Sequence, residues 1–325
     1  MALFDFPLDK LKTYNPSEKA PKDFDAFWKR TLAETERAAP VSPHFVEVKD
    51  SFYKLVDVYD VTFKGYMGQD VKGWFIEPAG NESALPCIVS FVGYGGGRNL
   101  PAEHVSPTIA GFAHFVMDTR GQGSNWSPGN TPDIVQHDDG GQYPGFMTRG
   151  ILSPETYYYR RVFTDAVRAI AAAAEHPHVD PSRIAVTGAS QGGGITIAAA
   201  ALSNKKVKLA MADVPFLCHF TRATTIIDSH PYGEIAGYLK AHRDRKNAVY
   251  NTLSYFDGIH FAPKITARTL FSVALMDQTC PPSTVYAAYN RIKSKKEIRI
   301  YDFNNHEGGG PFQHAERLRF ASAWL

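Results

Sequence analysis

The sequence predicts an α/β fold: a mostly parallel central sheet, an antiparallel N-terminal edge and helices on both faces. Short apolar runs at residues 87–92 and 113–117 are typical of strands buried on both faces. An alanine-rich stretch at residues 160–176 has strong helix propensity. Strands that alternate with helices in this way indicate a parallel sheet with helical crossovers.

The N-terminal part differs from the rest of the chain in its residue composition and hydrophobic pattern. Residues 25–38 place apolar and polar side chains as a short, peripheral amphipathic helix would. Residues 45–78 are rich in β-branched and aromatic side chains and are interrupted by glycines. This pattern predicts two or three antiparallel strands at the sheet edge.

The remaining elements continue the alternation. The helix at residues 160–176 is expected to end near Pro177, and a second helix covers residues 195–203. Four further strands are expected, at residues 183–187, 208–214, 269–275 and 297–303. Residues 216–261 do not fit this rhythm and are predicted to be an insertion over the carboxyl edge of the sheet, where ligands bind in such folds. We predict a single domain over residues 1–325.

Composition narrows the class of partner. The 325 residues carry 35 Lys and Arg against 33 Asp and Glu, a formal charge of +2. A charge this close to neutral gives no strong positive potential that would attract nucleic acid or an anionic membrane. The expected partner is therefore a small molecule. No segment is long and apolar enough to span a membrane.

Cysteine usage and the N-terminus favour a cytoplasmic location. The three cysteines are widely separated and odd in number, which suggests neither a disulfide framework nor a metal site. Residues 1–9 lack the basic start and apolar core of a secretory signal.

Ser190 is the candidate nucleophile. It is the central residue of a G-x-S-x-G motif at residues 188–192, which lies between a predicted buried strand and a predicted helix. This strand-turn-helix context is what a nucleophile elbow requires, and its glycines clear space around the tight turn.

A serine hydroxyl needs a base and an orienting acid, and in this kind of fold the order is Ser, Asp or Glu, His. Asp277 directly follows the predicted strand at residues 269–275, and His306 follows the last strand in a glycine-rich loop. We predict Ser190, Asp277 and His306 as the catalytic residues.

Two backbone amides are candidate donors to an oxyanion. One belongs to Gln191, the residue after the nucleophile, and the other to Tyr94 in the glycine-rich loop that follows residues 87–92. Hydrogen bonds at these positions would stabilise the charge that develops during acyl transfer.

Other polar residues have simpler interpretations. His137, Asp138 and Asp139 lack a second ligand group at metal-site spacing and are read as a solvated loop. Helix capping explains His176 and His178, and Cys280 is expected to be buried.

These residues resemble the seventh family of carbohydrate esterases, the acetyl xylan esterases and cephalosporin C deacetylases. The likeness covers nearly the whole chain. The motifs that carry it are FDFPLDKLKTYNP near the N-terminus, GYGGGR at residues 93–98, RGQG at 120–123, PGFMTRGI at 144–151, YYYRRVF at 157–163, GASQGG at 188–193, DQTCPPST at 277–284 and NHE at 305–307.

The resemblance implies an α/β-hydrolase fold with Ser190 as nucleophile, His306 as base, Asp277 as its partner, and the Tyr94 and Gln191 amides as oxyanion donors. It also implies deacetylation of short xylo-oligosaccharides and cephalosporin C, and assembly as a homo-oligomer, a hexamer in many members. No cofactor or metal is expected. Asn99 departs from the pattern, because a glycine is expected after the loop arginine.

Three other functions stay open from the residues alone. The first is a general carboxylesterase acting on short acyl chains. A prolyl-oligopeptidase-type peptidase shares the elbow and the residue order, but such enzymes usually carry a propeller domain for which this chain has no room. A non-catalytic binding member of the fold would not need all three predicted catalytic residues.

Overall fold

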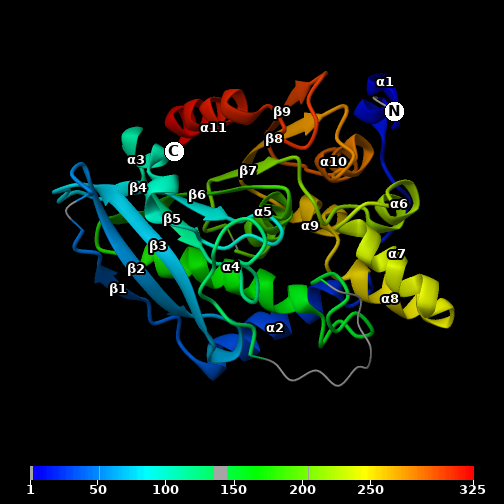
Figure 1. The fold of residues 1–325 in the computed structure, drawn as a ribbon, viewed down its shortest axis with the longest axis horizontal. Coiled ribbons are helices and arrows are strands. Elements are labelled where there is room, and N and C mark those ends of the chain that lie inside the picture. Colours follow the sequence, from blue (N-terminus) through cyan, green and yellow to red (C-terminus); the bar gives the residue numbers. More distant parts are fainter. Residues whose placement is uncertain (1–2, 51, 135–144, 204) are drawn as a thin grey trace.

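A nine-stranded sheet forms the centre of the computed structural model, which describes residues 3–50, 52–134, 145–203 and 205–325 (Figure 1). The order across the sheet is β1-β2-β3-β5-β4-β6-β7-β8-β9. The strands are β1 (His44–Glu47), β2 (Val56–Lys64), β3 (Asp70–Pro78), β4 (Leu85–Phe91), β5 (Ala113–Met117), β6 (Val179–Ala189), β7 (Leu209–Asp213), β8 (Arg268–Ala274) and β9 (Lys296–Tyr301).

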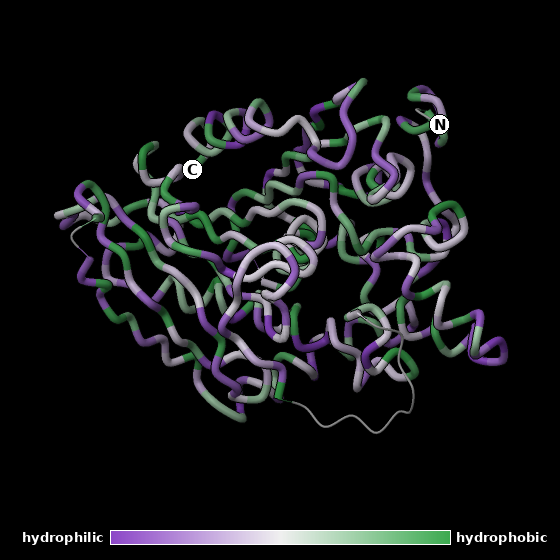
Figure 2. Tube along the Cα trace, in the orientation of Figure 1, coloured by the Kyte–Doolittle hydropathy of each residue, from purple (hydrophilic) through white to green (hydrophobic). Residues whose placement is uncertain are grey.

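The type of strand pairing changes once across the sheet, from antiparallel to parallel at β5. β1, β2 and β3 pair antiparallel, and β3 is also antiparallel to β5. Every pairing from β5 to β9 is parallel. Buried and less buried positions alternate at residues 61–64 of β2 and 70–75 of β3, as expected for an edge with one face against the core. Figure 2 shows hydrophilic and hydrophobic residues interspersed along both strands. The predicted mostly parallel sheet with an antiparallel N-terminal edge is confirmed.

Helices lie on both faces of this sheet, as predicted. The α-helices are α1 (Leu8–Thr13), α2 (Phe24–Ala38), α3 (Ser106–Ile109), α4 (Tyr158–Ala174), α5 (Gln191–Leu202), α6 (Phe220–Ile226), α7 (Tyr232–Ala241), α8 (Lys246–Ser254), α9 (Gly258–Phe261), α10 (Pro282–Tyr289) and α11 (Gly310–Trp324). Short 3₁₀ turns are η1 (Tyr66–Gly68), η2 (Pro101–His104), η3 (Arg243–Arg245) and η4 (Ala262–Lys264). Figure 1 shows α11 on one side of the sheet and α2 with α4 on the other. None of the helices in the described ranges combines the length and apolarity needed to cross a bilayer.

The core explains why α5 is apolar on all sides. This helix packs against β6, β7 and α4 and buries the first ten of its residues, 191–200. A helix that has no polar face must be buried all round. A smaller cluster, which includes Ile88, Met211 and Leu270, packs against Phe320 of α11 on the opposite face. The two clusters fix the sheet and α5 as a rigid base for the residues at the strand ends.

Strand ends differ from the sequence prediction by a few residues. β6 begins at Val179, four residues early, because Val179 pairs with Leu85 at the start of β4. β7 ends at Asp213, because Val214 has a φ of 36° and leaves the extended conformation. These differences are set by pairing between distant segments and by local backbone conformation.

The sheet order reverses around β4. From β4 the chain first adds β5 on one side, and later adds β6 on the other side. The loops that follow β4 and β6 therefore leave the sheet in opposite directions and open a crevice at its carboxyl edge. Residues 93–97 follow β4 and Ser190 follows β6, so the predicted site lies at this switch point.

Candidate active site

Ser190 lies at the junction between β6 and α5. β6 ends at Ala189 and α5 begins at Gln191, which confirms the predicted strand-turn-helix context. Ser190 has φ 57° and ψ −121°, a conformation that L-residues rarely adopt. Its backbone N–H donates to the Asp213 carbonyl at 3.0 Å, and its carbonyl accepts from the N–H of Phe216 at 2.9 Å. The surrounding fold therefore holds the strained backbone in place.

Two glycines make this turn possible. A Cβ atom at Gly188 would lie 2.4 Å from the carbonyl carbon of Gly192, and one at Gly192 would lie 2.2 Å from the carbonyl oxygen of Phe91. Both distances are far below ordinary contact, and the obstructing atoms belong to the backbone. The two glycines of the motif are thus sterically required, as the sequence predicts.

Asp277 and His306 meet although 29 residues separate them. His306 Nδ1 lies 2.9 Å from Asp277 Oδ2. Asp277 is fully buried, and its other carboxylate oxygen accepts the N–H groups of Thr279 and Cys280 at 2.7 and 2.9 Å. The carboxylate is therefore held rigidly against one side of the imidazole. If Nδ1 carries the proton, Nε2 is left as the basic nitrogen.

A pocket of about 470 Å³ joins these residues at the carboxyl edge of the sheet. Its lining includes Ser190, His306 and Tyr94, and the rim residue Trp126, which is 60% exposed. Its volume falls in the range of small-molecule sites, roughly 300–1,000 Å³. Because Asp277 contacts His306 from behind, the structure brings all three predicted catalytic residues to one site.

The two predicted oxyanion donors are unoccupied backbone amides. Within the described ranges, the N–H groups of Tyr94 and Gln191 donate to no acceptor. Gln191 is the first residue of α5, where an N–H has no partner inside the helix. The positive end of the helix dipole adds to this donor. Both amides remain available to a negatively charged oxygen beside Ser190.

Polar side chains tie the two donor loops together. The Gln122 side-chain oxygen accepts the N–H of Gly95 at 2.7 Å, and its Nε2 donates to Gln191 Oε1 at 2.8 Å. Tyr159 donates to the same Gln191 oxygen at 2.8 Å. Arg120 forms a buried ion pair with Asp165, at 2.5 and 2.7 Å. Arg120 and Gln122, from the RGQG motif, therefore hold loops by hydrogen bonds and ion pairs.

Glu234 was not found from the sequence. It lies on α7, and its Oε1 accepts the Tyr94 hydroxyl at 2.6 Å while its Oε2 accepts the N–H of Met147 at 3.0 Å. The Tyr94 hydroxyl in turn accepts the N–H of Phe146 at 2.6 Å. Burial raises the pKa of Glu234. The only sequence signal is a glutamate next to Ile235 on the buried side of a short helix.

Replacing Glu234 by glutamine is expected to lower kcat about tenfold with little change in KM, because Tyr94 is then held less firmly and one oxyanion donor is displaced. Steady-state kinetics on an aryl acetate measures the effect. Tyr94→Phe removes the other half of the contact, so the double variant should be no worse than either single one. Tyr238→Phe, on the same helix, is the control. Full activity in Glu234→Gln would contradict this role.

The other sequence interpretations have mixed outcomes. Cys280 is buried as expected, as are Cys87 and Cys218, and all three are free thiols. Asn99 has a φ of 52°, so it adopts the left-handed conformation for which a glycine was expected, and asparagine tolerates this better than most residues.

His176 and His178 both contact residues of β3. The capping role predicted for His176 and His178 is wrong. His176 stacks on Phe75 at 3.9 Å between ring centroids, and His178 contacts Glu77. The loop interpretation of residues 137–139 falls outside the described residues.

A family model and two solved structures point to the same family. The model of the acetyl xylan esterase (AXE1) family matches residues 1–324. An acetyl xylan esterase from Paenibacillus sp. R4 is 41% identical, with a TM-score of 0.93 over 98% of this chain and 100% of that chain. Acetyl xylan esterase 1 from Thermoanaerobacterium sp. JW/SL YS485 is 32% identical, with a TM-score of 0.90 over 99% and 100%.

A curated relative is more distant. The acetyl esterase Axe7A of Xylanibacter ruminicola is 28% identical over 308 residues, which cover 90% of this chain. This chain spans only 64% of that relative's length. The family match extends over nearly every residue and confirms the resemblance inferred from the motifs. The chain belongs to the acetyl xylan esterase family.

Proposed function

We propose that this protein is a serine esterase that removes acetyl groups from acetylated xylo-oligosaccharides and from cephalosporin C-type acetyl esters. The observation that carries the proposal is the contact between His306 and the buried Asp277 in a pocket that also contains Ser190. Membership of the acetyl xylan esterase family supports the same chemistry.

The proposed reaction has two steps. His306 Nε2 takes the proton of the Ser190 hydroxyl as its oxygen attacks the acetyl carbonyl. The resulting oxyanion accepts hydrogen bonds from the amides of Tyr94 and Gln191. As the tetrahedral intermediate collapses, the carbon–oxygen bond to the alcohol breaks, and His306 gives its proton to the departing alcohol. An acetyl group then remains on Ser190.

Water completes the cycle. His306 takes a proton from a water molecule as the water oxygen attacks the acetyl-enzyme, and the second intermediate collapses to acetate and free Ser190. Asp277 accepts a hydrogen bond from Nδ1 throughout and stabilises the charged imidazole. The reaction as proposed needs no cofactor or metal.

The residues that line the pocket around Ser190 limit which substrates can fit. Trp126 donates its indole N–H to the Tyr94 carbonyl at 2.8 Å and packs over Gly96, where an added Cβ would lie 2.2 Å from its ring. His230 and Glu234, from the segment between β7 and β8, line the other side. This supports the predicted placement of the insertion over the carboxyl edge. The homo-oligomer, a hexamer in many members of the resembled family, is proposed on that resemblance alone.

Hydrolysis of matched acetyl, butyryl and octanoyl aryl esters tests the acetyl preference. We expect the rate to fall steeply beyond acetyl, because a pocket of this volume must hold both the acyl group and the alcohol. Acetate release from acetylated xylo-oligosaccharides and from cephalosporin C then tests the alcohol. If longer esters are cleaved as well or better, the protein is a general carboxylesterase instead.

A further inference from the structure

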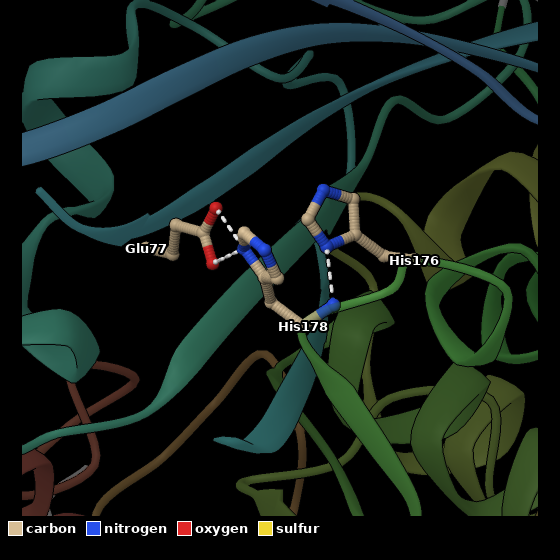
Figure 3. Close-up of side chains that lie close together, drawn as sticks. All are labelled: Glu77, His176 and His178. Atoms are coloured by element: carbon tan, nitrogen blue, oxygen red, sulfur yellow. Dashed lines mark hydrogen bonds and ion pairs between the residues drawn. The ribbon is translucent and has the colours of Figure 1, made fainter. Parts of the chain in front are cut away.

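A second group of titratable side chains lies at the opposite edge of the sheet. Glu77 is near the end of β3, and His176 and His178 lie in the turn between α4 and β6. One ligand-type atom from each residue lies within 4.8 Å of the others. Figure 3 shows the Glu77 carboxylate facing the His178 ring, with His176 beside them. The length of β4, about 20 Å for seven residues, separates this group from the pocket.

The negative charge of the buried Glu77 carboxylate has little opposing charge nearby. It is 1% exposed, and within the described ranges it forms no ion pair with a lysine or arginine. Its only ion-pair partner there is His178, whose Nδ1 lies 2.9 and 3.0 Å from the two carboxylate oxygens. A buried carboxylate in this situation favours a cation beside it.

His176 adds a second imidazole. Its side chain is buried beside the other two residues, and each imidazole nitrogen without a proton is a possible metal ligand. Its Nδ1 accepts a long hydrogen bond, 3.3 Å, from the N–H of His178. His178 is 31% exposed, which leaves one side of the group open to water.

We propose that Glu77, His176 and His178 form a binding site for a divalent transition-metal ion of the Zn²⁺ type. Two imidazoles, one carboxylate and a water molecule are a donor set that zinc accepts in tetrahedral geometry. At bond lengths of about 2.0–2.1 Å, such ligand atoms lie roughly 3.4 Å apart. The present separations of up to 4.8 Å therefore close with shifts of about 1.5 Å or less.

The surroundings suit such a site. Asn81 donates a side-chain N–H to Glu77 Oε2 at 3.4 Å, as residues behind a metal ligand commonly do. The His178 carbonyl accepts the N–H of Leu85 at 2.8 Å, which anchors the turn to the start of β4. An ion held here would cross-link β3 to the turn between α4 and β6, and would stabilise the fold. This role is independent of the proposed esterase activity.

Co²⁺ titration of the full chain, followed by visible absorption, tests the proposal. Asp277, Cys280 and His306 are a second group of possible ligands, so all titrations use a Cys280→Ala background, checked for folding by circular dichroism. We expect one tetrahedral Co²⁺ per chain, displaced by Zn²⁺, and a higher Tm in the presence of Zn²⁺.

Two conservative variants locate the ion. His178→Gln retains a hydrogen-bonding partner for Glu77, and His176→Phe retains the ring that stacks on Phe75. Each should weaken Co²⁺ binding at least about tenfold and abolish the Zn²⁺-dependent rise in Tm. Absence of Co²⁺ binding to the Cys280→Ala protein that retains both histidines would overturn the proposal. Binding that persists unchanged in both variants would also overturn it, because the ion would then lie elsewhere.

Discussion

Replacing Ser190 by alanine is expected to lower kcat for aryl acetate hydrolysis by at least about a thousandfold, because no other group can form the acetyl-enzyme. The substitution should leave the structure around the turn unchanged. Alanine removes one oxygen from a half-buried side chain and keeps the backbone contacts of the turn with Asp213 and Phe216. Initial rates with an aryl acetate, corrected for the uncatalysed reaction, measure the loss.

A matched serine and a covalent probe complete this test. Ser203 is buried just after α5, and its hydroxyl donates to the carbonyl of Ala200, away from the pocket residues. Ser203→Ala should therefore keep near-normal activity. A serine-reactive phosphonate should label Ser190 in the parent chain, and labelling should vanish in Ser190→Ala. Near-normal hydrolysis by Ser190→Ala would remove Ser190 from the mechanism, and absence of labelling would favour a non-catalytic binding protein.

Asp277→Asn should lower kcat by about a thousandfold to ten-thousandfold at neutral pH. Asparagine is nearly the same size, but its neutral amide neither fixes the proton on His306 Nδ1 nor stabilises the imidazolium that forms in the transition state. The N–H groups of Thr279 and Cys280 would select the amide oxygen as their acceptor. The amide NH₂ would then face His306, which reverses the required hydrogen bond.

Asp213 provides the matched control for this substitution. It also lies at the carboxyl end of a strand and is 4% exposed. Its carboxylate accepts a hydrogen bond from Gln313 at 2.6 Å and forms an ion pair with Arg317 at 3.1 Å. Asp213→Asn should change kcat by less than about tenfold, since its carboxylate faces α11 and not His306. Similar losses in both variants would show that any buried strand-end carboxylate matters equally, against a specific role for Asp277.

Local patterns allowed the region around Ser190 to be predicted in detail. The buried strand, the glycines at 188 and 192 and the apolar helix are consecutive in the chain, so each predicts its neighbour. Asp277 and His306 could be placed because both lie in the loops that follow β8 and β9, and parallel strands end at the same edge of a sheet.

Contacts between distant segments could not be predicted in this way. Glu234 reaches Tyr94 across 140 residues, and its position depends on how α7 packs over the sheet. Glu77 meets His178 across 101 residues because β3 pairs with β5 in a register that brings its end to the start of β4. For the same reason the sequence favoured helix capping for His176 and His178, since it showed only the helix beside them.

At Ser190, the proposed activity and the stability of the fold favour different residues. A non-glycine residue in such a conformation costs about 1–3 kcal/mol, and the surrounding hydrogen bonds must supply it. Glycine at this position would relieve the cost and remove the hydroxyl at the same time. Stabilising substitutions found without selection for turnover would therefore tend to erase the proposed nucleophile, and any engineering of this protein for heat resistance has to hold residue 190 fixed.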